Sequence, residues 1–298
     1  LITTAPTFGL LLFFHILMRI FNSFYHPLGI SLVAKTHARG DIDRAMGVQS
    51  GSGNLGVLAA FLTTGFLAQA YGWRRPLLAW AAAGLLLGGL SFLAVRGVST
   101  RVRGAELPKA SRWLETAGRI RDFIPGFIYG GAGWGVVIYF APSLFNHKFK
   151  VPLGRTGIYL ALWIGVGTAV TYLFGWLCRR LGRKRLTMLS MGGSALTLAL
   201  IGLAPRSGPA LAGLVLYGVF LFLIYPAMQA FVGTRVPDRD QALAFSLVSN
   251  IQVFSGALIV LLSGFLSDLI GIHAPFLLMA VLGAILAAFY ARRAPKDR

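Results

Sequence analysis

Cysteine and acidic side chains are scarce in this sequence. Its 298 residues include one cysteine, Cys178, and nine Asp and Glu against 28 Lys and Arg. A single cysteine excludes an internal disulfide and leaves no cysteine cluster for a metal, so no metal site is predicted. Charged residues make up 12% of the chain and hydrophobic residues 56%, which lies outside the usual composition of soluble globular domains. The composition therefore indicates a membrane protein.

Long apolar segments recur along the whole chain, separated by short basic ones. Each is long enough to cross about 30 Å of hydrocarbon as a helix. Strand-length alternation is missing, and a backbone in lipid must satisfy its own hydrogen bonds, so the sequence predicts an all-α polytopic membrane protein. The nine predicted spans are 9–34, 45–70, 77–95, 122–145, 156–178, 186–204, 209–233, 243–267 and 274–291.

The basic residues are distributed unevenly between alternate connections. One set of connections, including 96–121 and the tail, holds 21 Lys and Arg, and the other holds 6. The positive-inside rule therefore predicts a multi-pass protein of the plasma (inner) membrane with a cytoplasmic C-terminus. A net charge of +19 would suggest nucleic acid as a partner of a soluble protein, but here the charges lie where they orient membrane spans.

Two segments, one in each half of the chain, have similar sequences and form an internal repeat. The segment GFLAQAYGWRRPLL begins at Gly65, and GFLSDLIGIHAPFLL begins at Gly264, at an offset of 199 residues. The same offset pairs Gly72 with Gly271 and Asp41 with Asp240 without a gap. One helical unit is therefore present twice, with spans one to three matching spans seven to nine.

Spans four to six have no partner under this offset. We therefore expect three more helices, on the order of 80 residues, ahead of Leu1 to complete a 6+6 arrangement. The chain also lacks an initiator methionine and a signal peptide, which agrees with an N-terminal truncation.

Two six-helix halves in parallel repeat, joined by a basic linker, resemble the major facilitator superfamily (MFS) of transporters. The resemblance implies an MFS-type 6+6 helix bundle that lacks its first three helices. It divides the chain into the remainder of the N-terminal bundle at 1–95, a cytoplasmic linker at 96–121 and a C-terminal six-helix bundle at 122–298.

The basic connection after the fifth span resembles the family's gating loop, G-x-L-x-D-R-x-G-R-K/R. The segment GWLCRRLGRKR keeps the pattern except that Arg179 replaces the acidic residue that acts as a latch. The matching residues are Gly175, Leu177, Arg180, Gly182, Arg183 and Lys184. Asp268 ends span eight beside a glycine turn, where we expect a capping or latching role.

The first span resembles the family's fourth helix. Arg19 to Ser23 is similar to an R-x-x-Q-G motif, and FYHPLG after it is similar to an element of the fosmidomycin-resistance-like branch. Antiporters of the family carry a Gly-Pro pair in the next helix, where this chain has Ala60 and Phe61. This departure weakens an assignment as a drug:proton antiporter.

Four polar side chains of the first span recur at i, i+4, i+7 and i+11 and share one helical face: His15, Arg19, Asn22 and His26. An arginine in a span is costly unless it faces water or a partner. One interpretation is a substrate cavity in which Arg19 attracts an anionic group and His26 donates a hydrogen bond. The alternative is that Arg19 pairs with a carboxylate on another helix and the histidines bind backbone carbonyls.

Two later spans supply further cavity candidates. Span seven offers Tyr217, Tyr225 and Gln229 on one face, as ligands or as hydrogen bonds between helices. Span four contains YGGAGWGVVIYF, and its glycines lower helix propensity by about 1 kcal/mol each, which predicts local unwinding flanked by Tyr129 and Trp134. The alternative there is close packing of helices through small residues.

These features predict a secondary active transporter of a small organic solute, anionic or drug-like, that works by alternating access as a monomer in the lipid bilayer. A coupled proton is a further expected partner, although no mid-membrane carboxylate is visible. No nucleotide-binding loop, cofactor motif or catalytic cluster is visible, so no enzyme activity or cofactor is predicted. A receptor or scaffold that keeps the transporter fold without transport is the alternative, and Arg179 supports it.

Overall fold

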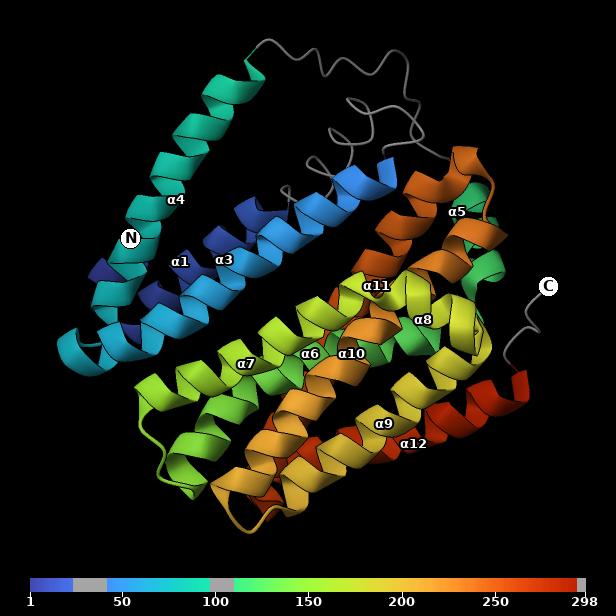
Figure 1. Ribbon diagram of the computed structural model, residues 1–298. Coiled ribbons are helices and arrows are strands. Elements are labelled where there is room, and N and C mark those ends of the chain that lie inside the picture. Colours follow the sequence, from blue (N-terminus) through green and yellow to red (C-terminus); the bar gives the residue numbers. More distant parts are fainter. Residues whose placement is uncertain (24–41, 97–109, 294–298) are drawn as a thin grey trace. The chain divides into compact units, whose positions relative to one another are not determined.

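The computed structural model describes residues 1–23, 42–96 and 110–293, and every regular element in these ranges is a helix (Figure 1). The chain divides into two units, Leu1–Glu106 and Leu107–Arg298, which are described separately below. The N-terminal unit contains η1 (Ile2–Thr4), α1 (Phe8–Ser23), α3 (Ile42–Tyr71) and α4 (Arg74–Val95). The C-terminal unit contains α5 (Ala110–Ile120), α6 (Ile124–Ser143), η2 (Leu144–Lys148), α7 (Leu153–Tyr172), α8 (Phe174–Leu181), α9 (Arg183–Leu203), α10 (Ser207–Arg235), α11 (Asp238–Ile270) and α12 (Ala274–Arg293).

The predicted spans reappear as long apolar helices. Eight helices in the described ranges are long and apolar enough to cross a membrane. The first predicted span, 9–34, begins as α1, and its residues 24–34 lie outside the described part of the chain. The fifth, 156–178, is divided: α7 ends at Tyr172 and the short helix α8 starts at Phe174. Hydropathy could not locate this break because the side chains on both sides of it are apolar.

The N-terminal unit is held together at one end by polar contacts. The Nε of Arg74 donates to the carbonyl oxygen of Thr3 at 3.0 Å, which joins α4 to η1. The indole Nε1 of Trp80 donates to the Thr64 hydroxyl at 3.2 Å and joins α4 to α3. None of the described residues of α1 is buried, so this unit has little core of its own.

The repeat found in the sequence also appears in the backbone. Gly72 follows α3 with φ +80°, and Gly271 follows α11 with φ +104°. Each donates its N–H to the carbonyl four residues earlier, Ala68 or Ser267, at 2.9 Å. A left-handed glycine just after the last helical residue is a common helix C-terminus, and here it starts the next span in both units.

The C-terminal unit is a bundle in which the spans pack in pairs. Helix α6 packs against α11, α9 against both α10 and α12, and α7 against α10. Figure 1 shows α9 and α12 running side by side along one side of this bundle. The largest side chains in its interior are Trp163, Tyr129, Tyr217 and Phe145, all less than 2% exposed. This core fixes the positions of the polar groups described below.

The predicted unwinding of the glycine-rich span is wrong, because α6 is continuous from Ile124 to Ser143. Its glycines instead admit side chains from neighbouring helices, which is the packing alternative. A Cβ on Gly133 would collide with the Tyr217 hydroxyl, and one on Gly131 would lie 2.6 Å from the Gln252 carbonyl oxygen. Close packing thus outweighs the low helix propensity of glycine. The helical geometry changes only after Pro142, where the π-helical turn η2 follows.

The predicted linker 96–121 contains a helix. Helix α5 occupies Ala110–Ile120 and belongs to the C-terminal unit, where it contacts α10 and α11. Its charged sequence hid it from a search for apolar spans, although its apolar side chains recur at helical spacing.

Candidate functional site

The polar stripe predicted on the first span is present on α1 as far as the described residues reach. The Nε of Arg19 donates a hydrogen bond to Nε2 of His15 at 3.4 Å. This contact confirms that the i, i+4 spacing places the two side chains on one face. Arg19 and Asn22 are exposed in the N-terminal unit, and His26 lies outside the described residues.

In the C-terminal unit, Tyr225 on α10 forms a polar pair with α11. The side-chain Nε2 of Gln252 donates to the Tyr225 hydroxyl at 2.9 Å. The ring of Tyr225 lies beside Gly130 on α6, 3.5 Å from where a Cβ on that glycine would be. No sequence pattern singles out Gln252 as the partner of Tyr225. The side chain of Gln229, predicted on the same wall, lies outside the described set.

Further hydroxyls are enclosed within the same bundle. Those of Tyr129 on α6, Ser194 on α9 and Tyr217 on α10 are buried and have no hydrogen-bond partner among the described residues. Ser194 lies close to Tyr129, but without the geometry of a hydrogen bond. Because the bundle encloses Tyr129 and Tyr217 completely, the structure places them at helix interfaces rather than on an accessible wall.

An aromatic cluster joins α6, α7 and α10. The ring centroid of Trp134 lies 5.0 Å from that of Trp163 and 5.7 Å from that of Phe222. The rings of Trp163 and Phe222 are 5.8 Å apart and meet edge to face, a favourable arrangement. Trp163 and Phe222 are buried, whereas Trp134 is partly exposed, so Trp134 is the member that a solute could reach. The sequence pointed to Trp134 alone.

The basic loop forms the junction of α8 and α9. Gly182, with φ +77°, separates the two helices, and Gly175 lies in the first turn of α8. The guanidinium of Arg180 stacks 4.6 Å from the ring centroid of Trp176, while Lys184 is partly buried in the first turn of α9. The side chain of Arg183 lies outside the described set.

The position of Asp268 tests only its expected capping role. Helices α9, α10 and α11 cross the bundle in turn, so the end of α11 and the α8–α9 junction lie at opposite ends. Asp268 is exposed there, and the N–H of Gly271, bonded to Ser267, closes the helix. The backbone N–H of Gly271, and not the Asp268 side chain, therefore closes α11, and the latching role of Asp268 stays a prediction.

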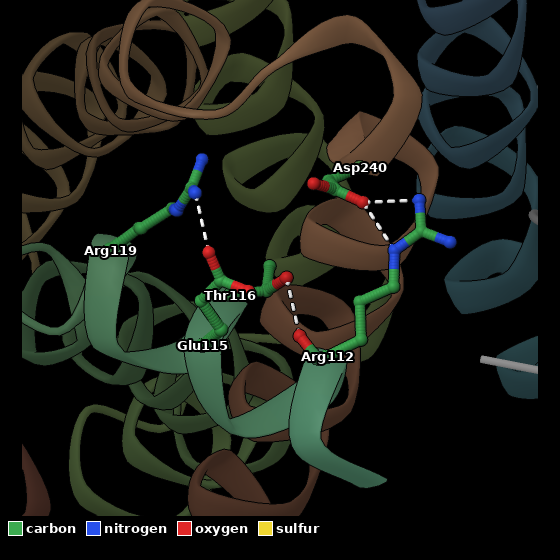
Figure 2. Close-up of polar contacts among 5 residues, drawn as sticks. All are labelled: Arg112, Glu115, Thr116, Arg119 and Asp240. Carbon is green, nitrogen blue, oxygen red and sulfur yellow. Dashed lines mark hydrogen bonds and ion pairs between the residues drawn. The ribbon is translucent and has the colours of Figure 1, made fainter. Parts of the chain in front are cut away.

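An ion pair that the sequence did not predict ties α5 to α11 (Figure 2). Both Nε and Nη2 of Arg112 contact Oδ1 of Asp240, at 2.6 and 2.5 Å. Asp240 is only 6% exposed, which is unusual for a charged side chain. It is one of nine acidic residues in the chain. The internal repeat singled it out as the counterpart of Asp41, but nothing in the sequence indicated its partner.

The groups assembled in both units suit reversible binding. They are cations, amides, hydroxyls and aromatic rings, which hold a solute by charge, hydrogen bonds and stacking. Among the described residues, no three His, Cys, Asp or Glu side chains come together as a metal site would require.

A family model described as Major Facilitator Superfamily matches residues 1–224 and again 131–298. The chain belongs to the major facilitator superfamily. This membership and the long apolar helices identify a multi-pass membrane protein of a transporter family. The assignment to the fosmidomycin-resistance-like branch rests on residues outside the described ranges and stays a prediction.

Several bacterial proteins of the superfamily are similar to this chain. The multidrug resistance protein MdtG of Proteus mirabilis is 32% identical over 164 residues, which cover 52% of this chain and 39% of that protein. MdtG of Dickeya zeae is 30% identical over 167 residues, with the same coverage. An uncharacterized MFS-type transporter of Pseudomonas aeruginosa is 26% identical over 208 residues, 68% of this chain and 50% of that protein. The chain thus spans between two fifths and half of the length of these relatives.

Proposed function

We propose that this superfamily member is part of a secondary active transporter that moves a small organic solute by alternating access. Membership of the superfamily supports the proposal most directly. The repeat supports it as well, because transporters built from parallel repeats rock one bundle against the other around a midplane site. The paired glycine turns at Gly72 and Gly271 give that repeat a structural basis.

The proposed solute carries an aromatic ring and is drug-like. Two of the relatives are named multidrug resistance proteins. In this chain the partly exposed Trp134, backed by Trp163 and Phe222, offers a surface on which a flat ring can stack. As a separate proposal for the N-terminal unit, Arg19 on α1 attracts anionic solutes, because a guanidinium binds carboxylates and phosphonates well. Proton coupling and a monomeric state complete the proposal.

The orientation follows from the charge distribution. With 21 basic residues in one set of connections and 6 in the other, we propose that α5, the α8–α9 junction and the C-terminus face the cytoplasm of the inner membrane. The proposal includes no enzymatic step.

The alternative is a receptor or scaffold that binds a solute without moving it. Arg179 favours it, since a cation stands where the family's gating loop carries an acid, and it is exposed at the α8–α9 junction. A loop without its acidic latch could fail to stabilise one of the two states that transport requires.

Flux through proteoliposomes tests the proposal. The complete protein that contains this chain is reconstituted and offered a neutral aromatic solute, an aromatic carboxylate and an aliphatic carboxylate. We expect flux of the aromatic carboxylate to be fastest. Trp134→Leu should raise its KM about tenfold, whereas Phe265→Leu, which changes an exposed aromatic side chain on α11, should leave it unchanged. Binding of solute without any flux would favour the receptor.

A further inference from the structure

One face of α5 is packed against the C-terminal bundle. Thr116 and Ile120 are buried, and Trp113 and Ala117 are partly buried, at the i, i+3, i+4 and i+7 spacing of a single helical face. Leu114, on the other side, is 75% exposed. Since α5 contacts both α10 and α11, it lies across the end of the bundle where one of these spans stops and the next begins.

The ion pair with Asp240 stands at the edge of this packed face (Figure 2). Asp240 lies in the first turn of α11, where the helix dipole favours a negative charge, and its N–H bonds to the carbonyl of Pro237. A carboxylate buried to this degree needs a cationic partner, and Arg112 reaches it with two nitrogens. In the neighbouring pair on α5, Glu115 with Arg119, the carboxylate side chain is 62% exposed, and the pair joins residues within one helix.

We propose that Arg112 and Asp240 are positioning residues that fasten the linker helix α5 across the ends of α10 and α11, so that the linker moves with the C-terminal bundle as one body. The role in transport rests on the proposed function, whereas the fastening does not. The packed face alone offers few large apolar side chains, because Thr116 and Ala117 are small and α5 is only 11 residues long. The ion pair therefore fixes the position of α5 along α11.

This fastening has a consequence for alternating access. Helix α5 is followed in the chain by α6, so a movement of the linker would act on α6 directly. The ion pair would transmit the same movement to the first turn of α11 as well. Helix α6 also packs against α11, so the ion pair gives the linker helix a second attachment to the same pair of spans. Releasing the pair should slow the exchange between states without altering the solute site, because neither residue belongs to the aromatic cluster or to the α1 stripe.

Cysteine labelling measures the fastening directly. Cys178 is the one cysteine of this sequence, so the background for labelling the complete protein in membranes is Cys178→Ser together with serine at any cysteine elsewhere in that protein. Thr116→Cys reports the packed face, Leu114→Cys the exposed face, and Ser263→Cys a buried position far along α11. A soluble maleimide should modify Thr116→Cys at least about tenfold faster once Arg112→Ala or Asp240→Asn is added. The matched control, Arg119→Ala, should change nothing.

Unchanged protection of Thr116→Cys in both variants would overturn the proposal. If Arg112→Ala also exposes Ser263→Cys, the bundle has opened as a whole, and Asp240→Asn, which leaves no buried charge, decides the question. In flux measurements Arg112→Ala and Asp240→Asn should lower turnover about tenfold with KM unchanged. Loss of protection without loss of turnover would overturn the role in transport. A parent protein without any flux would refute the proposed function, while the labelling result would still decide the fastening.

Discussion

The glycines of the two units have opposite surroundings. In the N-terminal unit, a Cβ added to Gly53, Gly56 or Gly84 would meet no atom within 4 Å. In the C-terminal unit, a Cβ on Gly218 would lie 2.5 Å from the backbone oxygen of Trp163, and most other glycines of that unit are similarly enclosed. Glycine content alone therefore does not distinguish a tightly packed span from one whose small residues meet nothing in their own unit.

The same contrast appears in the burial of whole spans. No residue in the most apolar stretch of Ser52–Tyr71 or Arg74–Ala94 is buried, against 56% of the stretch in Ile124–Lys148. Yet the two units share a repeat, with the glycine turns at Gly72 and Gly271 in equivalent places. A helix can bury its faces only against other helices, so the repeat specifies helices and turns while the six-span bundle supplies the core.

The largest effect should come from the exposed stripe of the N-terminal unit. Arg19→Ala in the complete protein should abolish flux while membrane insertion and expression stay intact, because the proposed function gives this cation within a span the role of binding the anionic group of the solute. Flux in proteoliposomes, normalised to inserted protein, checks this.

A milder variant separates charge from shape at this position. Arg19→Lys keeps the charge but loses the planar fork, and should retain a fraction of the flux with a raised KM. Normal flux through Arg19→Ala would remove this residue from the site and leave the N-terminal unit without a demonstrated role in binding.

One substitution made in both units tests the contrast between the glycines. Gly218→Ala should lower the free energy of unfolding by about 2 to 3 kcal/mol, because the backbone of Trp163 cannot move aside and α7 must separate from α10. Gly84→Ala should raise it by about 0.5 to 1 kcal/mol through helix propensity, since its Cβ meets nothing. Thermal or denaturant unfolding of the purified complete protein in detergent measures both.

The outcome at Gly84 is the more informative of the two. A stability loss there comparable to that at Gly218 would mean that other parts of the complete protein pack closely on α4. The difference in glycine surroundings between the units would then hold only for the chain described here and would not apply to the complete protein.

How far the sequence predicts the molecule differs between the fold and the site. Hydropathy and the offset of 199 residues anticipated the spans and the turns at Gly72 and Gly271, because chain-local rules govern both. The partners of Tyr225 and Arg112 could not be predicted, since Gln252 and Asp240 lie 27 and 128 residues further along. Only the packing of α10 and α5 against α11 brings those side chains together.

The smallest effects should come from two tyrosines on α10. Tyr225→Phe removes the hydroxyl that accepts from Gln252 and leaves that amide short of a partner, so the free energy of unfolding should fall by about 1 kcal/mol. Tyr217→Phe removes a buried hydroxyl that has no partner among the described residues, so stability should stay the same or rise by up to about 1 kcal/mol.

These two changes remove the same atom from the same helix, eight residues apart, and differ only in what the oxygen meets. Parallel unfolding curves for both variants and the parent give the two differences under one set of conditions. A loss at Tyr217 as large as that at Tyr225 would show that the enclosed hydroxyl is hydrogen-bonded in the membrane, for instance through a buried water shared with Tyr129 and Ser194. The polar interior of the C-terminal unit would then be a hydrated network, and its contrast with the exposed stripe of α1 would be one of access rather than of hydrogen bonding.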